Sequence, residues 1–116
     1  MVCLEPLLVP RVRQGEVQLK NALGGLLGGL LRSYLPQTWS IITEREALTI
    51  HADAQGNIRI MKEAMGQGDG EIRIPHDLLA NGIRTGARPP AGSYQVTYFT
   101  PKGRTAFEYL RGSFGL

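Results

Sequence analysis

The sequence has few of the residues that carry covalent or metal chemistry: its 116 residues include one cysteine and two histidines. Cys3 has no second cysteine to pair with, so an internal disulfide framework is excluded. A lone cysteine fits a reducing compartment, and we expect a cytoplasmic protein. His51 and His76 have no cysteine or glutamate at a zinc-like spacing, which argues against a metal centre.

Long hydrophobic runs are also missing. The longest apolar stretch without a charge covers residues 22 to 31, whereas a membrane-spanning helix needs about 20 such residues. This stretch follows Arg11 and Lys20 and ends at Arg32 instead of a small-residue cleavage site, which argues against a signal peptide. The sequence predicts neither a membrane span nor a leader.

Charge of one sign is not concentrated anywhere. Thirteen Lys and Arg against ten Asp and Glu give a net charge of +3, and no three basic residues are consecutive. A surface that follows a phosphate backbone usually shows a clustered basic patch, so charge does not favour nucleic acid as a partner. The segment from Gly66 to Gly70 lacks the Gly-Lys-Ser/Thr ending of a phosphate loop. We therefore expect no enzyme activity, no catalytic residues, no cofactor and no metal.

Glycine and proline organise the chain. Pro6, Pro10 and Gly15 predict an irregular N-terminal arm over residues 1 to 15, followed by a single domain over residues 16 to 116. Apolar residues then recur at helical spacing and predict a helix over residues 16 to 35, which Pro36 would end. The apolar positions of this predicted helix are Leu19, Leu23, Leu26, Leu27, Leu30, Leu31 and Tyr34.

After Pro36 the apolar period changes to two. Alternation predicts strands near residues 39 to 43, 48 to 53, 58 to 60, 71 to 74 and 94 to 98. Asp77 and Gly82 bound a short helix, and Thr105 with Glu108 fits a capping box that opens a last helix. These elements predict an α+β fold: a five-stranded, mostly antiparallel sheet covered on one face by helices.

Four glycines lie inside the first predicted helix: Gly24, Gly25, Gly28 and Gly29. At about 1 kcal/mol each relative to alanine they would weaken it by roughly 4 kcal/mol. Close packing against the sheet would compensate, and so would a homodimer formed through the smooth glycine strips. The alternative is a soft helix, over residues 16 to 35, that opens for a ligand or lies on a membrane surface with its leucines inserted.

The second half of the chain carries a spaced motif of strand, helix and turn residues. The motif consists of Glu71 to Ile74, Asp77 to Ala80, Thr85 with Gly86, Pro90, Gly103 and an apolar last helix. With this motif the second half resembles the sterol-carrier-protein type-two domain, and the leading helix and strand meander are similar to that family's first half. The resemblance spans roughly residues 16 to 112. It implies a sterol-carrier-like fold with an apolar tunnel that takes up fatty acyl chains, sterols or similar lipids, without catalysis.

A local resemblance points to another function. Residues 70 to 75, with Leu78, Gly82 and Gly86, are similar to the swapped-hairpin DNA-binding domain of bacterial transition-state regulators. That resemblance implies that residues 105 to 110 form a strand. Under it, the residues that approach DNA would be Arg73, Arg84 and Arg88.

We favour the binding or carriage of a hydrophobic small molecule in an apolar cavity between sheet and helices. The alternatives are a DNA-binding regulator and a non-catalytic subunit that dimerises through its glycines. The predicted ligand-binding residues are Leu23, Leu27, Leu30, Trp39, Ile41, Leu79, Phe107 and Leu110.

Overall fold

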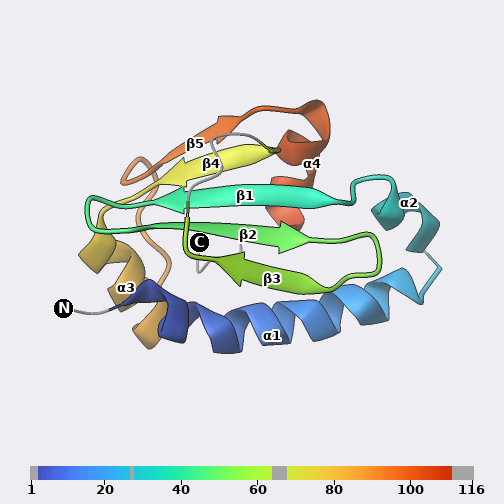
Figure 1. Cartoon of the computed structure of the whole chain (residues 1–116), viewed down its shortest axis with the longest axis horizontal. Helices are drawn as coiled ribbons and strands as arrows, with labels where there is room; N and C mark the ends of the chain where they lie inside the picture. Colours follow the sequence, from blue (N-terminus) through green and yellow to red (C-terminus); the bar gives the residue numbers. More distant parts are fainter. Residues whose placement is uncertain (1–2, 27, 64–67, 111–116) are drawn as a thin grey trace.

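The structure is a computed structural model that describes residues 3–26, 28–63 and 68–110. Within these residues it forms an α+β domain with a five-stranded sheet, as expected; the sheet is open and its strand order is β3-β2-β1-β4-β5 (Figure 1). The helices are α1 (Leu4–Leu23), α2 (Gly28–Arg32), α3 (His76–Thr85) and α4 (Pro101–Leu110). The strands are β1 (Gln37–Ile42), β2 (Ala47–Ala52), β3 (Ile58–Met61), β4 (Gly70–Arg73) and β5 (Gln95–Tyr98).

The sheet is mixed, with three antiparallel pairs and one parallel pair. β1, β2 and β3 form an antiparallel meander, and β4 pairs with β5 in the same sense. β1 and β4 are parallel, with Ile41 beside Ile72. A parallel pair requires a crossover, and here the chain crosses from the β3 edge to β4. The predicted meander and the mostly antiparallel sheet are therefore confirmed.

Period-two alternation divides the side chains between two faces. Trp39, Ile41, Leu48, Ile50 and Ile72 share the apolar face, and all five are buried. The other face carries polar side chains, but Ser40 and Thr49 at its centre are buried. The Thr49 hydroxyl donates to the main-chain oxygen of Glu63, which belongs to the crossover. The main chain at Glu63 therefore packs on the polar face beside Thr49.

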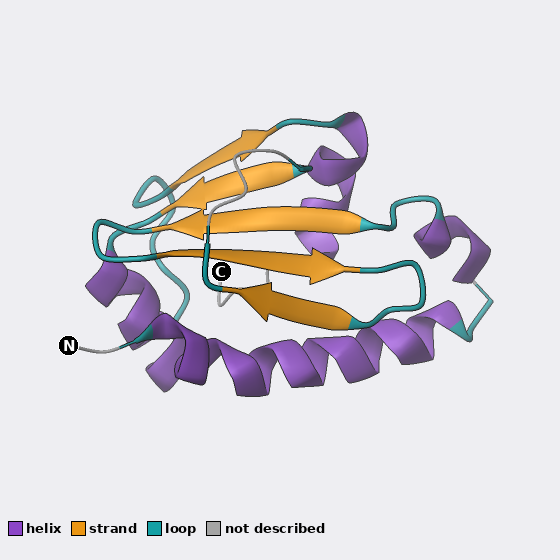
Figure 2. Cartoon of the chain, viewed as in Figure 1, coloured by secondary structure: helices purple, strands orange, loops and turns teal. Residues whose placement is uncertain are grey.

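Three helices pack against the apolar face and its β3 edge, while the view in Figure 2 looks onto the opposite face. α1 contributes Leu4, Leu8 and Val12, which recur every four residues and are fully buried. α3 contributes Leu79 and α4 contributes Phe107 to the same core. The guanidinium of Arg11 also donates to the main-chain oxygen of Ile83 at 3.1 Å, joining α1 to α3.

The predicted irregular arm over residues 1 to 15 is wrong, because α1 begins at Leu4 and continues through Pro10. Pro6 lies near the helix start, where main-chain N–H groups lack intrahelical acceptors in any case. Pro10 removes one hydrogen bond from the helix interior. The three buried side chains Leu4, Leu8 and Val12 offset that loss.

The single helix predicted over residues 16 to 35 is also wrong. α1 ends at Leu23, with Gly24 as its C-cap, and the chain turns before α2 begins at Gly28. A β-carbon at position 28 would lie 2.0 Å from the main-chain oxygen of Leu23, so only glycine allows the chain to pass there. The glycines thus separate two helices, and the leucines after Leu23 do not continue the face of α1.

The two later helices are confirmed in kind and corrected at their ends. α3 passes through Gly82 and ends at Gly86, whose φ of 76° is left-handed. α4 begins at Pro101, because the Thr100 hydroxyl accepts a hydrogen bond from the N–H of Gly103 at 3.0 Å. The capping box predicted at Thr105 is wrong, since that hydroxyl donates back to the oxygen of Pro101 inside the helix.

Candidate functional site

An aromatic cluster joins the surface to the centre of the sheet. Trp39 of β1 lies 5.3 Å, centroid to centroid, from Phe107 of α4 and 6.0 Å from Tyr98 of β5. The rings of Tyr98 and Phe107 are 5.9 Å apart and nearly perpendicular. Trp39 and Phe107 are buried, whereas Tyr98 is 38% exposed. The three rings therefore extend from the molecular surface at Tyr98 to the core at Trp39 and Phe107.

A glycine makes room for the indole of this cluster. Gly70 lies beside Trp39 on the apolar face, and a β-carbon there would fall 2.4 Å from the indole ring. The indole N–H donates to the side-chain oxygen of Gln37 at 2.9 Å, so the one polar group of Trp39 is paired. The indole ring therefore packs closely against the backbone of β4 at Gly70.

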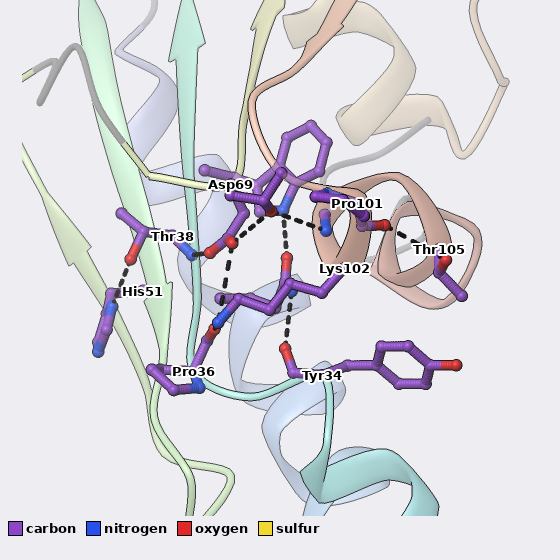
Figure 3. Close-up of polar contacts among 12 residues, drawn as sticks. Tyr34, Pro36, Thr38, His51, Asp69, Pro101, Lys102 and Thr105 are labelled. Carbon is purple, nitrogen blue, oxygen red and sulfur yellow. Dashed lines mark hydrogen bonds and ion pairs between the residues drawn. The ribbon is translucent and has the colours of Figure 1, made fainter.

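A buried aspartate fixes α4 over the aromatic cluster (Figure 3). The carboxylate of Asp69 accepts hydrogen bonds from the N–H of Thr38 at 2.9 Å and from the hydroxyl of Thr100 at 2.7 Å. The Lys102 ammonium lies 3.8 Å from the same carboxylate and donates to the oxygen of Pro36. Asp69 thus ties the start of α4 to the start of β1.

Close contact completes this anchor. A β-carbon at Gly103 would lie 2.3 Å from the main-chain oxygen of Asp69, so the first turn of α4 rests directly on the chain before β4. The same oxygen accepts the N–H of Phe99 at 2.9 Å. The first turn of α4 therefore has a fixed position relative to three strands.

The predicted ligand-binding residues are only partly brought together. Trp39, Ile41, Leu79 and Phe107 belong to one buried core. Leu23 is buried at the end of α1, where its side chain contacts the β2-β3 hairpin near Gly56. Leu30 does not join them, because the α1-α2 turn leaves it 57% exposed. Two more predicted positions, Leu27 and the side chain of Leu110, lie outside the described residues.

Sequence reasoning missed Asp69 and Tyr98 as site residues. Asp69 falls in a segment that composition assigns to a flexible connection, and no sequence pattern links it to Thr38 or Thr100. Alternation places Tyr98 in a strand but does not mark it as a site residue. One sequence signal does predict the start of α4: Thr100 followed by Pro101, because an N-cap residue before a proline at the first helical position marks a helix start. This signal places the helix start three residues after Tyr98.

A groove of about 590 Å³, lined by both polar and apolar residues, lies at the end of the sheet where β1 and β4 finish; we call this the groove end. Charged residues at its walls include Glu44 and Arg73. Both carboxylate oxygens of Glu44 lie 3.0 Å from the N–H of His76, and this hydrogen bond lowers the pKa of Glu44. Arg73 pairs with Glu71 at 2.8 Å. These charged groups are engaged in holding the strand ends and α3.

Each of the two histidine rings is hydrogen-bonded to a threonine hydroxyl. The ring Nδ1 of His51 lies 2.8 Å from the Thr38 hydroxyl on the polar face. The ring Nδ1 of His76 lies 3.2 Å from the Thr43 hydroxyl at the start of α3. Among the described residues, no group of three or more His, Cys, Asp or Glu side chains is arranged to hold a metal ion.

The opposite end, where β1 and β4 begin, differs in character; we call it the leucine end. It consists of residues 24–26 and 28–36, which hold the described part of the α1-α2 turn and α2, together with residues 98–104. Leu26 and Leu30 are exposed there, and so are the rings of Tyr98 and Phe99. The guanidinium of Arg104 lies 5.7 Å from the Tyr98 ring centroid. The aromatic cluster opens to solvent at this end.

Comparison with known proteins adds no assignment: no family model, curated protein or solved structure matches this chain. Within the described part of the chain, no helix is both long and apolar enough to cross a membrane.

Proposed function

We propose that the protein binds and carries a hydrophobic small molecule, such as a fatty acyl chain, along the aromatic cluster between α4 and the apolar face of the sheet. The observation that carries the proposal is the sequence of rings from half-exposed Tyr98 to buried Phe107 and Trp39. A ligand that covers exposed rings removes apolar surface from water, worth about 25 cal/mol per Å².

The placement of α4 supports this site. α4 is anchored through its first turn by Asp69, Thr100 and Gly103, on the side of the helix nearest Tyr98. Its next turn contributes Phe107, which lies against Trp39. A ligand entering beside Tyr98 would separate Phe107 from the sheet while the anchored turn stays in place. The indole of Trp39 would form the inner wall of the site.

The order of elements supports the same function by analogy. A leading helix, a three-strand meander, a further strand, a helix, a strand and a last helix are the order that the sterol-carrier-like resemblance implies. Fold analogy alone does not assign a function, so the proposal depends on the aromatic cluster.

The swapped-hairpin alternative loses its structural basis. It needs a strand over residues 105 to 110, and these residues belong to α4. Two of its three arginines also do not share a surface: Arg73 projects from the polar face of β4, whereas Arg84 lies on α3, which packs on the other face. The helical glycine strips proposed for a homodimer are not formed, because Gly24 and Gly25 lie in a turn and Gly28 is buried.

The single tryptophan provides a direct test. Delipidated protein is titrated with a dibrominated stearic acid and, in parallel, with stearic acid, while the emission of Trp39 is recorded. Bromine quenches an indole only at contact distance, so the brominated acid should quench and the plain acid should not. Native mass spectrometry of the untreated protein should also recover bound lipid. Absence of both quenching and co-purified lipid would refute the proposal.

Tyr98, the last residue of β5, and Tyr94, the residue before β5, give a matched pair of variants. Tyr98→Ala removes the entrance ring and should weaken binding of the brominated acid about tenfold, which corresponds to about 1.4 kcal/mol. Tyr94→Ala changes a half-buried tyrosine at the groove end and should leave the affinity within about twofold. Equal losses in the two variants would place the ligand elsewhere. Circular dichroism checks that both variants fold.

A further inference from the structure

We infer that the leucine end docks on the surface of an anionic lipid bilayer. The α1-α2 turn presents Leu26, whose side chain is fully exposed, and Leu30, which is 57% exposed. Both follow glycine pairs that hold the chain in a projecting turn. Phe99 adds an exposed ring at the same end. This inference goes beyond the proposed function and does not require that a ligand is carried.

The charged residues around these side chains indicate the kind of partner that the leucine end binds. Residues 17 to 43 contain no Asp or Glu, while Lys20 and Arg32 lie before and after the projecting turn. Lys102 and Arg104 add two cations from the first turn of α4, and Lys102 is tied to this end by its hydrogen bond to Pro36. Exposed leucines surrounded by cations are complementary to anionic head groups above an acyl layer.

Two acidic side chains near this end are engaged in hydrogen bonds. Asp69 is buried under α4 and accepts hydrogen bonds from Thr38 and Thr100. Asp53 in the neighbouring hairpin accepts hydrogen bonds from the N–H groups of Gln55 and Asn57. The carboxylate of Asp69 is therefore buried, and the charges next to the projecting turn along the chain are the cations Lys20 and Arg32.

The shape of this end favours a bilayer over another macromolecule. A nucleic acid would use the cations but has no place for exposed leucines on a projecting turn. The leucines project from a short helix and a turn, so they can enter the head-group region without any change in the fold. A second copy of the chain is the remaining occupant, and the experiment distinguishes it.

The test is co-sedimentation of the full chain with vesicles of phosphatidylcholine, alone or mixed with phosphatidylglycerol. The wild type should bind the mixed vesicles at low salt, and binding should fall as salt is raised because the charges become screened. Leu26→Asp and Leu30→Asp should each reduce the bound fraction about tenfold, since each replaces an inserting side chain by an anion. No binding of the wild type to the mixed vesicles at low salt overturns the inference.

Matched variants separate position from charge. Val17→Asp introduces the same charge at a residue of α1 that is 59% exposed and lies away from the turn, so binding should stay within about twofold. Arg32→Glu should weaken binding, whereas Arg84→Glu on α3 should not. Equal losses in Val17→Asp and Leu30→Asp overturn the inference.

Two further measurements distinguish the bilayer from a second copy of the chain and from the carried ligand. Native mass of each variant reports self-association: a wild-type dimer that Leu30→Asp dissociates, with no vesicle binding, assigns this surface to a second copy and overturns the inference. Quenching of Trp39 by the brominated acid is measured on the same samples. Vesicle binding without quenching refutes the carrier function alone, and quenching without vesicle binding refutes the docking surface alone.

Discussion

At the groove end, the strand ends are closed by polar side chains that bond to local backbone. Glu44 accepts the first N–H of α3, and Thr43 holds its own turn through the N–H groups of Arg45 and Glu46. At the leucine end, a buried aspartate closes the strands from within, and the outer surface carries Leu26, Leu30 and Phe99. The polar side chains of the groove end thus bond to nearby backbone, whereas the leucine end carries exposed leucines and an exposed phenylalanine.

The difference shows where the chain departs from what folding alone requires. An exposed leucine contributes little to stability, whereas burying one contributes about 1.5 to 3 kcal/mol. Scattered exposed apolar residues are ordinary, but apolar residues that gather at one end indicate an interaction surface. Exposed apolar residues gather at the leucine end, and both of our proposals place function there.

Among the substitutions that compare the two ends, Asp69→Ala is expected to change the free energy of unfolding most. The change leaves the N–H of Thr38 and the hydroxyl of Thr100 without their buried acceptor and releases the first turn of α4. Loss of such charged, buried hydrogen bonds should lower the free energy of unfolding by about 3 kcal/mol. Urea denaturation followed by Trp39 emission measures it. Asp53→Ala, an exposed turn residue at the same end, should cost less, and equal losses would contradict the anchoring role of Asp69.

The next largest effect on stability distinguishes two adjacent glycines of the leucine end, Gly28 and Gly29. Gly28→Ala places a β-carbon against the oxygen of Leu23 and should destabilise the fold by about 2 kcal/mol. Gly29→Ala meets nothing within 4 Å and lies in a helix, so it should be neutral or stabilise by about 0.5 kcal/mol. Thermal unfolding of the two variants makes the comparison. Similar melting temperatures would contradict the packed turn.

The same comparison shows what the sequence predicts well. The strands are predictable because their alternation is strict: Trp39 and Ile41 face the core, and Ser40 faces away. The α+β class and the predominance of antiparallel pairs follow from these strands and the helices around them. Local patterns suffice where one face is buried, because a shift of one residue would expose every apolar side chain.

The sequence is misleading where tertiary contacts outweigh local preference. Pro10 makes the first residues look irregular, yet burial of Leu4, Leu8 and Val12 keeps them helical. Leucines on both sides of Gly24 look like one helical face, although the chain turns there. Asp69 is not predicted at all, because its partners lie 31 residues away in each direction. Such long-range polar contacts leave no periodic signal.

The smallest effect is a pH dependence at the groove end. Hydrogen bonding from the N–H of His76 lowers the pKa of Glu44 below its ordinary value of 4.5. A carboxyl whose pKa is lower in the folded state stabilises the fold above its unfolded pKa, and this contribution disappears as the pH falls through the folded pKa. Glu44→Gln should therefore be less stable than the wild type near neutral pH, and the difference should shrink as the pH drops below 4.5.

Unfolding in urea over a series of pH values measures that difference. Glu16, on α1 toward the other end, is the matched position, because the N–H of Ile58 donates to its carboxylate at 2.7 Å and lowers its pKa in the same direction. Glu16→Gln should show the same sign, so acid should weaken both ends of the sheet. A gap between Glu44→Gln and wild type that stays constant from neutral pH to below pH 4.5 would mean that the carboxylate of Glu44 does not hold α3 through its charge.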